Sequence, residues 1–401
     1  MKNLMTALAS GFSALALASG IPTVSNARLD QDNTRHKVTI TYDLDMDAIV
    51  TVSLETNGVA VSAAHLQGLQ GDVSKLVSRG TGRQITWKPW KFWPEGGRIA
   101  GEIAVRVTAW PVASPPPYLV ADLTGAQAHR YYALEEALPG GVSNGAYRTT
   151  KMVFRKIPAA TACYRAGAPS WEPGYQSAQK VHYVTLTNDF YLAIFPLTQG
   201  QYKTLLGIAA ENPSSTIGDN LPLDNLSGGA AGIPYSGYAT IGSNNVESQK
   251  VMFYARGKTG IATMHIPTQA EWEFACRAGD NEPIYGGYTL DEVAWYADNS
   301  DGRLHPVGLK KANAFGLYDM LGNVYERTRD SAARGAYQSE QIAPFYGNSS
   351  HGSYQVMCGG AFNSEAAAVR PAAWEGGSDW QTHNWGYKVP GFGLRLMIPL
   401  R

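Results

Sequence analysis

The sequence predicts an α+β protein with little regular secondary structure, preceded by a small all-β sandwich domain. Three observations favour this fold class. Residues 35–112 contain runs in which apolar and polar side chains alternate with the period of a strand. Two helix-starting motifs lie beyond residue 151, among long loops rich in Gly, Asn and Ser. Between these regions stands Pro115-Pro116-Pro117, and stiff proline runs are typical of linkers.

The first 27 residues have the order of features of a secretory signal peptide. Lys2 supplies a positive start, and residues 4–20 form an apolar stretch broken only by small and hydroxyl residues. Ser25-Asn26-Ala27 then places small residues at both key positions of a cleavage site. We expect cleavage after Ala27 and a secreted, periplasmic or cell-surface location.

The alternative reading of residues 1–27 is an N-terminal membrane anchor. A spanning helix needs about 20 strongly apolar residues. The stretch here is shorter and rich in Ala, Ser and Gly. We therefore expect no membrane span after signal cleavage.

Charge and cysteine content exclude several classes of protein. Lys plus Arg and Asp plus Glu are 33 each, so the net charge is zero and gives no electrostatic attraction to nucleic acid or anionic membranes. The three cysteines, Cys163, Cys276 and Cys358, allow at most one internal disulfide. The chain is therefore not a disulfide scaffold, and whether any two of them pair stays open.

Residues 28–112 are expected to form an immunoglobulin- or fibronectin-like β-sandwich. The apolar members of three alternating runs are Val38, Ile40 and Tyr42; Val50, Val52 and Leu54; and Ile103, Val105 and Val107. Glycine-containing turns such as Asn57-Gly58 separate the runs. These strands would otherwise belong to the main domain, but the proline run favours a separate module, with residues 113–150 as a linker.

Two capping boxes mark helices in the second domain. Thr198 with Gln201 predicts a helix that runs through Leu205 and Leu206, and Thr268 with Glu271 predicts another. Gly279 is expected to end the second helix, because glycine readily adopts the left-handed conformation that stops one.

Five segments of the second domain match one family in order. They read FYL followed by TQGQY within 190–202, IPTQAEWEFA at 266–275, NAFGLYDMLGNVYE at 313–326, GGAF at 359–362 and GFGLR at 391–395. These segments resemble the formylglycine-generating enzyme (sulfatase-modifying factor) family. The resemblance covers about residues 150–400. It implies, for residues 151–401, the family's variant of the C-type lectin fold.

The resemblance also bears on catalysis. Active family members oxidise a sulfatase cysteine to formylglycine with a copper ion held by two cysteines that follow the Gly-Gly of the fourth segment. Aligned without gaps from Gly359-Gly360, those positions are Ser364 and Val369. Neither side chain can hold Cu(I), which needs soft sulfur ligands. We therefore expect no catalytic residue at these positions and no copper, although a formylglycine generator with relocated ligands, or another oxidative activity, is the competing enzyme hypothesis.

The third segment carries a candidate metal site. The resemblance implies a structural Ca²⁺ bound by the side chains of Asp319 and Glu326 and by the backbone carbonyls of Gly322 and Val324. Hard oxygen ligands suit calcium, and an ion bound only to the native state would stabilise a loop-rich fold. The alternative is a metal-free loop in which backbone amides bind Glu326.

A group of aromatic residues near the C-terminus is the candidate ligand-contact surface. Trp374, Trp380, Trp385 and Tyr387 stand among small polar residues, in a stretch that lies near the substrate cleft in the family. The alternative is that they fill the core. The sequence thus predicts a calcium-stabilised binding module for a protein or glycan ligand, with an enzyme or a structural cell-envelope protein as the alternatives.

Overall fold

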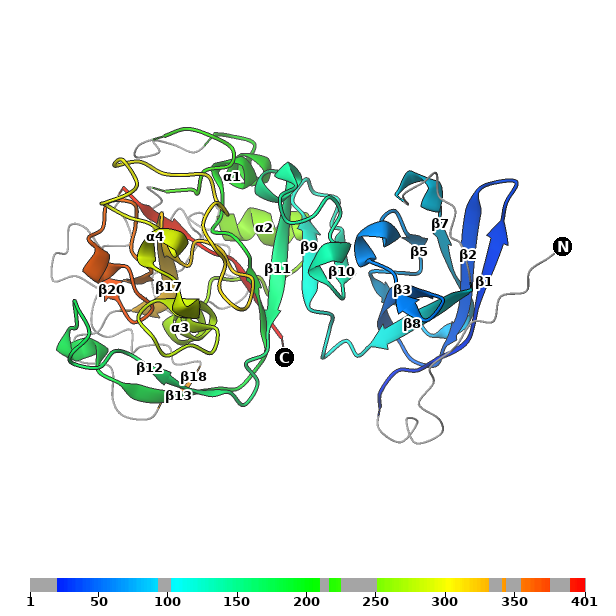
Figure 1. Ribbon diagram of the computed structural model, residues 1–401, viewed down its shortest axis with the longest axis horizontal. Helices are drawn as coiled ribbons and strands as arrows, with labels where there is room; N and C mark the ends of the chain where they lie inside the picture. The colour runs from blue at the N-terminus through cyan, green and yellow to red at the C-terminus, as the bar shows by residue number, and fades with distance from the viewer. Residues whose placement is uncertain are drawn as a thin grey trace. The chain divides into compact units, whose positions relative to one another are not determined.

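The computed structural model of the chain describes residues 20–92, 102–209, 216–224, 251–331, 341–343, 355–375 and 390–400 (Figure 1). The chain divides into two compact units. The first contains Met1–Val120 and His129–Asn144, and the second contains Ala121–Ala128 and Gly145–Arg401.

The first unit is built from two antiparallel sheets. One sheet has the order β1 (Val24–Asp32), β2 (Lys37–Leu44), β7 (Gly80–Trp87) and β5 (Gln70–Gly71). In the other, β3 (Ala48–Thr56) pairs with β4 (Val59–Ala60), β6 (Leu76–Val77) and β8 (Ile103–Trp110). Both sheets contribute side chains to one hydrophobic core, which confirms the predicted all-β sandwich.

The alternation read from the sequence places the core side chains correctly in β2 and β8. Val38, Ile40 and Tyr42 are buried while their neighbours in β2 are half-exposed. In β3 the pattern is only partly right, because Thr51 is buried as well and its hydroxyl accepts a hydrogen bond from the Trp110 indole at 2.8 Å. Asn57-Gly58 forms the two-residue turn from β3 to β4, both residues with positive φ, as this tight hairpin requires.

Strand β1 begins upstream of the predicted cleavage site. Val24 pairs with Leu44, and the backbone and hydroxyl of Thr23 donate hydrogen bonds to Asp45 at 2.7 and 2.6 Å. Ala27 is buried in the sandwich core. A boundary after Ala27 therefore does not fit this structure, because cleavage there would remove the first four residues of the strand.

We expect any removal of a leader to occur before Thr23. The mass of the mature chain, measured after export, should correspond to an N-terminus at or upstream of residue 23. A chain beginning at Arg28 should have a lower thermal midpoint than one beginning at Gly20, because it lacks these strand contacts. Recovery of a mature chain that begins at Arg28 and is equally stable would contradict this expectation.

The segment 113–150, expected as a linker, contains secondary structure. It forms β9 (Tyr118–Asp122), β10 (His129–Tyr132) and the 3-10 helices η5 (Glu135–Ala137) and η6 (Gly145–Arg148). The prediction was wrong over these residues because the apolar run that follows Pro117 is buried and forms a strand.

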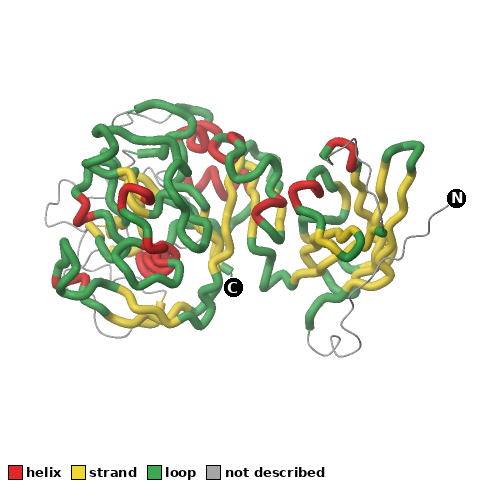
Figure 2. The backbone as a smooth tube through the Cα atoms, viewed as in Figure 1, coloured by secondary structure: helices red, strands yellow, loops and turns green. Residues whose placement is uncertain are grey.

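The second unit combines several small sheets with short helices. Its strands include the orders β11-β14-β22, β12-β13-β18, β15-β16 and β20-β19-β17-β21. Their bounds are β11 Lys151–Ile157, β12 Cys163–Ala166, β13 His182–Leu186, β14 Phe190–Ala193, β15 Ala294–Trp295, β16 Leu321–Gly322, β17 Tyr325–Ser331, β18 Gln341–Ala343, β19 Gln355–Cys358, β20 Trp374–Glu375, β21 Phe392–Leu394 and β22 Met397–Pro399. Figure 2 shows that loops make up much of this unit, in agreement with the predicted α+β class.

Both predicted capping boxes are present. The helices of this unit are α1 (Gln199–Leu206), α2 (Val251–Thr259), α3 (Gln269–Arg277) and α4 (Leu290–Val293). Thr198 caps α1 and Thr268 caps α3, each through reciprocal hydrogen bonds with the third helical residue. Helix α3 ends one residue earlier than predicted, since Ala278 rather than Gly279 adopts the left-handed cap conformation. None of the helices among the described residues has the length and apolar character needed to cross a bilayer.

Candidate functional site

Ser364 and Val369 lie after a tight turn at Gly359-Gly360. Both glycines have positive φ, and a Cβ on Gly359 would approach the Met320 carbonyl oxygen to 2.7 Å, so the turn excludes larger residues. The Ser364 hydroxyl accepts from the Ala361 amide at 2.9 Å and donates to the Tyr325 hydroxyl at 3.2 Å. Val369 is buried. A hydrogen-bonded hydroxyl and a buried isopropyl group offer no soft ligand for Cu(I).

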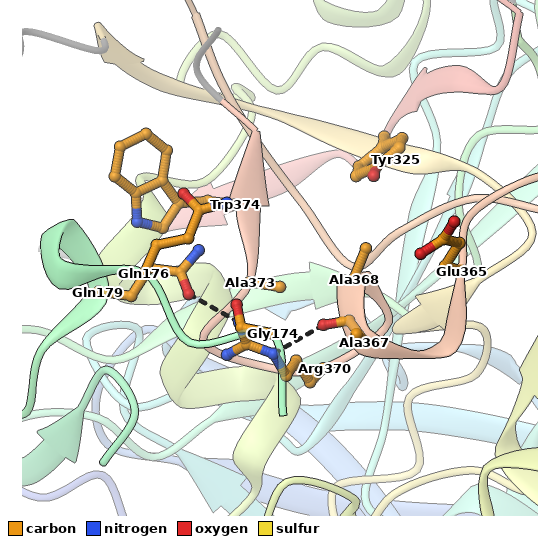
Figure 3. A pocket seen from close by; sticks show the side chains of 10 residues that line it. All are labelled: Gly174, Gln176, Gln179, Tyr325, Glu365, Ala367, Ala368, Arg370, Ala373 and Trp374. Atoms are coloured by element: carbon orange, nitrogen blue, oxygen red, sulfur yellow. Dashed lines mark hydrogen bonds between the residues drawn. The ribbon is translucent and has the colours of Figure 1, made fainter. Parts of the chain in front are cut away.

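An open pocket of about 170 Å³ lies beside these two positions (Figure 3). Three parts of the chain form its walls: the turn that contains η7 (Ser177–Gln179), strand β17, and the segment from η11 (Ala366–Ala368) to β20. The lining residues are Gly174, Gln176, Gln179, Tyr325, Glu365, Ala367, Ala368, Arg370, Ala373 and Trp374. The pocket therefore occupies the place at which the resemblance puts the family's reacting residues, with different chemistry in its walls.

Arg370 holds two of these walls together. Its Nη1 donates to Glu172 at 2.9 Å, its Nη2 donates to Gln179 Oε1 at 2.8 Å and to the Gly174 carbonyl, and its Nε donates to the Ala367 carbonyl at 2.8 Å. The side chains of Arg370 and Glu172 are only 5% and 3% exposed. The positive charge is thus balanced inside the protein, and each nitrogen of the guanidinium already donates to a protein acceptor.

Aromatic and acidic side chains complete the pocket. Trp374, one of the predicted contact residues, is half-buried on one side, and Tyr325 lies across the pocket from it (Figure 3). Glu365 is exposed at the same side as Tyr325. The other predicted contact residues, Trp380, Trp385 and Tyr387, lie outside the described residues.

The predicted calcium ligand Glu326 is bound by other side chains. Arg395 Nε lies 2.9 Å from both carboxylate oxygens and Arg395 Nη2 lies 2.6 Å from Oε1. The Trp272 indole donates to Oε2 at 2.6 Å. Glu326 and Arg395 are 1% and 0% exposed. Because a guanidinium already neutralises this carboxylate, a calcium ion would have to displace it.

Two of the other predicted ligands, Gly322 and Asp319, also have partners. The Gly322 carbonyl accepts from the Val324 amide at 2.8 Å. Asp319 Oδ2 accepts from the Gly308 amide at 2.6 Å, and burial raises the pKa of this carboxyl to about 6. Because the Glu326 and Asp319 carboxylates both already bind other groups, this arrangement does not fit a calcium ion. The alternative of a metal-free loop expected backbone amides as the partners of Glu326, but its partners are the side chains of Trp272 and Arg395.

The three cysteines are free and lie away from the pocket lining. Cys163 is exposed, whereas Cys276 and Cys358 are buried. Burial raises the pKa of both buried thiols, which disfavours their thiolate forms. Cys358 is thus a buried thiol outside the pocket lining.

Several pocket residues were not anticipated from the sequence. Glu172, Gln176 and Gln179 stand about 190 residues before Arg370, in a stretch without a helical or strand pattern. Glu365 directly follows Ser364, and Arg370 directly follows Val369. Their place beside the two matched positions could have identified them as site residues. Tyr325 lies within the NAFGLYDMLGNVYE segment, which was another signal.

Comparison with known proteins identifies relatives of the second unit. A family model described as sulfatase-modifying factor enzyme 1-like domain matches residues 146–391. The chaperone protein LppX of Paenibacillus barcinonensis is 30% identical over 179 residues, which are 36% of this chain and 62% of that protein. The formylglycine-generating enzyme of Mycobacterium tuberculosis is 38% identical over 82 residues, 17% of this chain and 27% of the enzyme. The chain thus spans less than two thirds of either relative.

A solved structure is also similar. PvdO from Pseudomonas aeruginosa superimposes with a TM-score of 0.49 at 22% sequence identity, over 62% of this chain and 94% of that one.

Proposed function

Because this chain belongs to the sulfatase-modifying factor enzyme 1-like family, we propose that it is an exported binding protein without copper oxidase activity. It binds its ligand in the pocket beside Ser364 and Val369. The first unit serves as a spacer or docking domain.

One observation carries this proposal. The two positions matched to the family's copper cysteines hold a hydrogen-bonded serine and a buried valine, yet an open pocket with aromatic and amide side chains lies directly beside them. A pocket without sulfur ligands in its walls can bind a ligand but cannot hold the Cu(I) that the oxidation needs. A relative named as a chaperone protein, a name that does not denote oxidation, supports the same reading.

The sequence supports export, whereas the structure argues against the predicted calcium ion. Export is supported by the charged, apolar and small-residue order of the N-terminal residues. Calcium was predicted from the resemblance alone, and the Glu326–Arg395 pair argues against it. We propose that this buried cation takes the stabilising part that the prediction gave to a metal.

The test is an oxidation assay on the full chain. Incubation with copper, a reductant and a cysteine-containing sulfatase peptide should give no aldehyde by mass spectrometry and no stoichiometric copper. The formylglycine-generating enzyme of Mycobacterium tuberculosis serves as the positive control. The double variant Ser364→Cys with Val369→Cys should bind copper, which would show that these positions limit the chemistry. Aldehyde formed by the unaltered chain and lost in Cys358→Ser would overturn the proposal.

A further inference from the structure

The two aromatic side chains of the pocket offer flat apolar surfaces. Trp374 and Tyr325 lie on opposite sides of it (Figure 3). Tyr325 is held in place by an edge-to-face contact with Phe392, at a centroid distance of 5.3 Å, and by the Ser364 hydroxyl. The negative face of an aromatic ring favours contact with weakly positive C–H groups. These walls suit a ligand that presents C–H bonds from a ring or chain.

The orientation of the Gln179 amide follows from its partner. A guanidinium has only donors, so the oxygen of Gln179 must face Arg370 Nη2, at 2.8 Å. The amide NH₂ is thereby turned to the other side. Gln179 is only 3% exposed, so this donor needs an acceptor from a ligand or water in the pocket it lines. Gln176, exposed at the same wall, adds an amide that both donates and accepts.

The charges around the pocket favour a neutral ligand. Arg370 is balanced by Glu172, so it offers no net positive charge to an anion. Glu365 is exposed at the pocket and would repel an anion. Glu365 would attract a cation, but the amide donor of Gln179 on another wall would not bind one. A hydroxyl group both donates and accepts, and therefore fits Glu365 and the two glutamines together.

The size of the pocket limits the ligand to one small unit. A volume of about 170 Å³ is smaller than the roughly 300–1,000 Å³ of pockets that hold a drug-sized molecule. Resting on the proposed binding function, we propose that this pocket binds one neutral sugar residue of a glycan, with its C–H face on Trp374 and its hydroxyls on Gln176, Gln179 and Glu365. This assigns the ligand class from the pocket itself.

Saturation-transfer NMR on the full chain tests the proposal. The probes are glucose, galactose, mannose and N-acetylglucosamine, with a pooled library of ten-residue peptides measured in parallel. We expect saturable binding of at least one sugar with a Kd on the order of 1 mM, as for a ligand of about 12 heavy atoms. Trp374→Ala and Gln176→Ala should each weaken it about 10-fold, the loss of one good contact. Phe253→Ala, which removes an aromatic group exposed elsewhere on the same unit, is the matched control and should bind normally.

The outcomes separate the two proposals. If no sugar binds but a peptide does, with the same sensitivity to Trp374→Ala, the sugar proposal fails and the binding function stands. If neither sugars nor peptides bind, while thermal unfolding shows a folded chain, both proposals fail. Sugar binding that is unchanged in Trp374→Ala and Gln176→Ala would place it elsewhere and overturn the assignment of this pocket.

Discussion

Replacing Arg395 by methionine is expected to lower the free energy of unfolding by about 3–5 kcal/mol, because it leaves the buried Glu326 carboxylate without its cation. The variant also loses the hydrogen bonds from Arg395 to the backbone carbonyls of Ala193 and Tyr318. Small domains are stable by only about 5–15 kcal/mol, so the loss is large. Urea unfolding of the full chain, followed by tryptophan fluorescence, measures it.

Two further variants identify the cause. Arg395→Lys keeps the charge but loses the two-pronged contact, so its loss should be smaller than that of Arg395→Met. Adding Glu326→Gln to Arg395→Met should recover part of the stability, because the uncompensated charge is gone. Arg303→Met is the matched control, since its pair with Asp301 is exposed and should contribute less than about 1 kcal/mol.

The same measurement decides the calcium prediction. We expect the midpoint of the unaltered chain to be the same with calcium and with a chelator. A rise of the unfolding midpoint in the presence of calcium, absent in Glu326→Gln, would support the predicted calcium site. It would also show that Arg395 moves away when the ion binds. A loss below about 1 kcal/mol in Arg395→Met would contradict the central role of the ion pair.

Replacing Arg370 by methionine is expected to cost about 3–5 kcal/mol and to abolish binding in the pocket. The variant leaves Glu172 buried without a cation and frees the Gln179 amide and the Gly174 carbonyl from their donor. Because Arg370 joins two walls of the pocket, the positions of Gln176 and Gln179 should no longer be fixed. Urea unfolding gives the stability, and the NMR titration gives the binding.

Variants separate the positioning role of Arg370 from a direct role in ligand binding. Arg370→Lys should keep much of the stability but weaken binding, because a lysine cannot hold Glu172 and Gln179 at once. Lys311→Met, which breaks an ion pair that is half-exposed, should change neither property measurably. Full binding by Arg370→Met would contradict the positioning role.

Local patterns in the sequence predicted local structure well. The burial of alternate residues in β2, the turn at Asn57-Gly58 and the capping boxes of α1 and α3 all depend on residues two or three apart. The identities of Ser364 and Val369 by themselves argue against copper ligation at these positions. Such features depend on backbone periodicity and residue chemistry, which act over a few residues.

The sequence did not reveal partners that are distant in the chain. The resemblance offered Glu326 as a calcium ligand, but its partner Arg395 comes from 69 residues further along and neutralises it. The prediction of a linker over residues 113–150 did not anticipate strand β9, because burial of its side chains depends on the folded structure. Ion pairs and burial of this kind depend on which segments pack together.

By itself, the sequence predicted a sandwich followed by a domain of the sulfatase-modifying factor family, with Ser364 and Val369 at the positions matched to the copper cysteines. Only the tertiary structure decided that Glu172 and Arg370, 198 residues apart, hold together a pocket beside those positions. It also decided that the Arg395 guanidinium binds the Glu326 carboxylate. The physical reason is that a buried charge is stable only beside a partner, and folding, not spacing along the chain, brings that partner there.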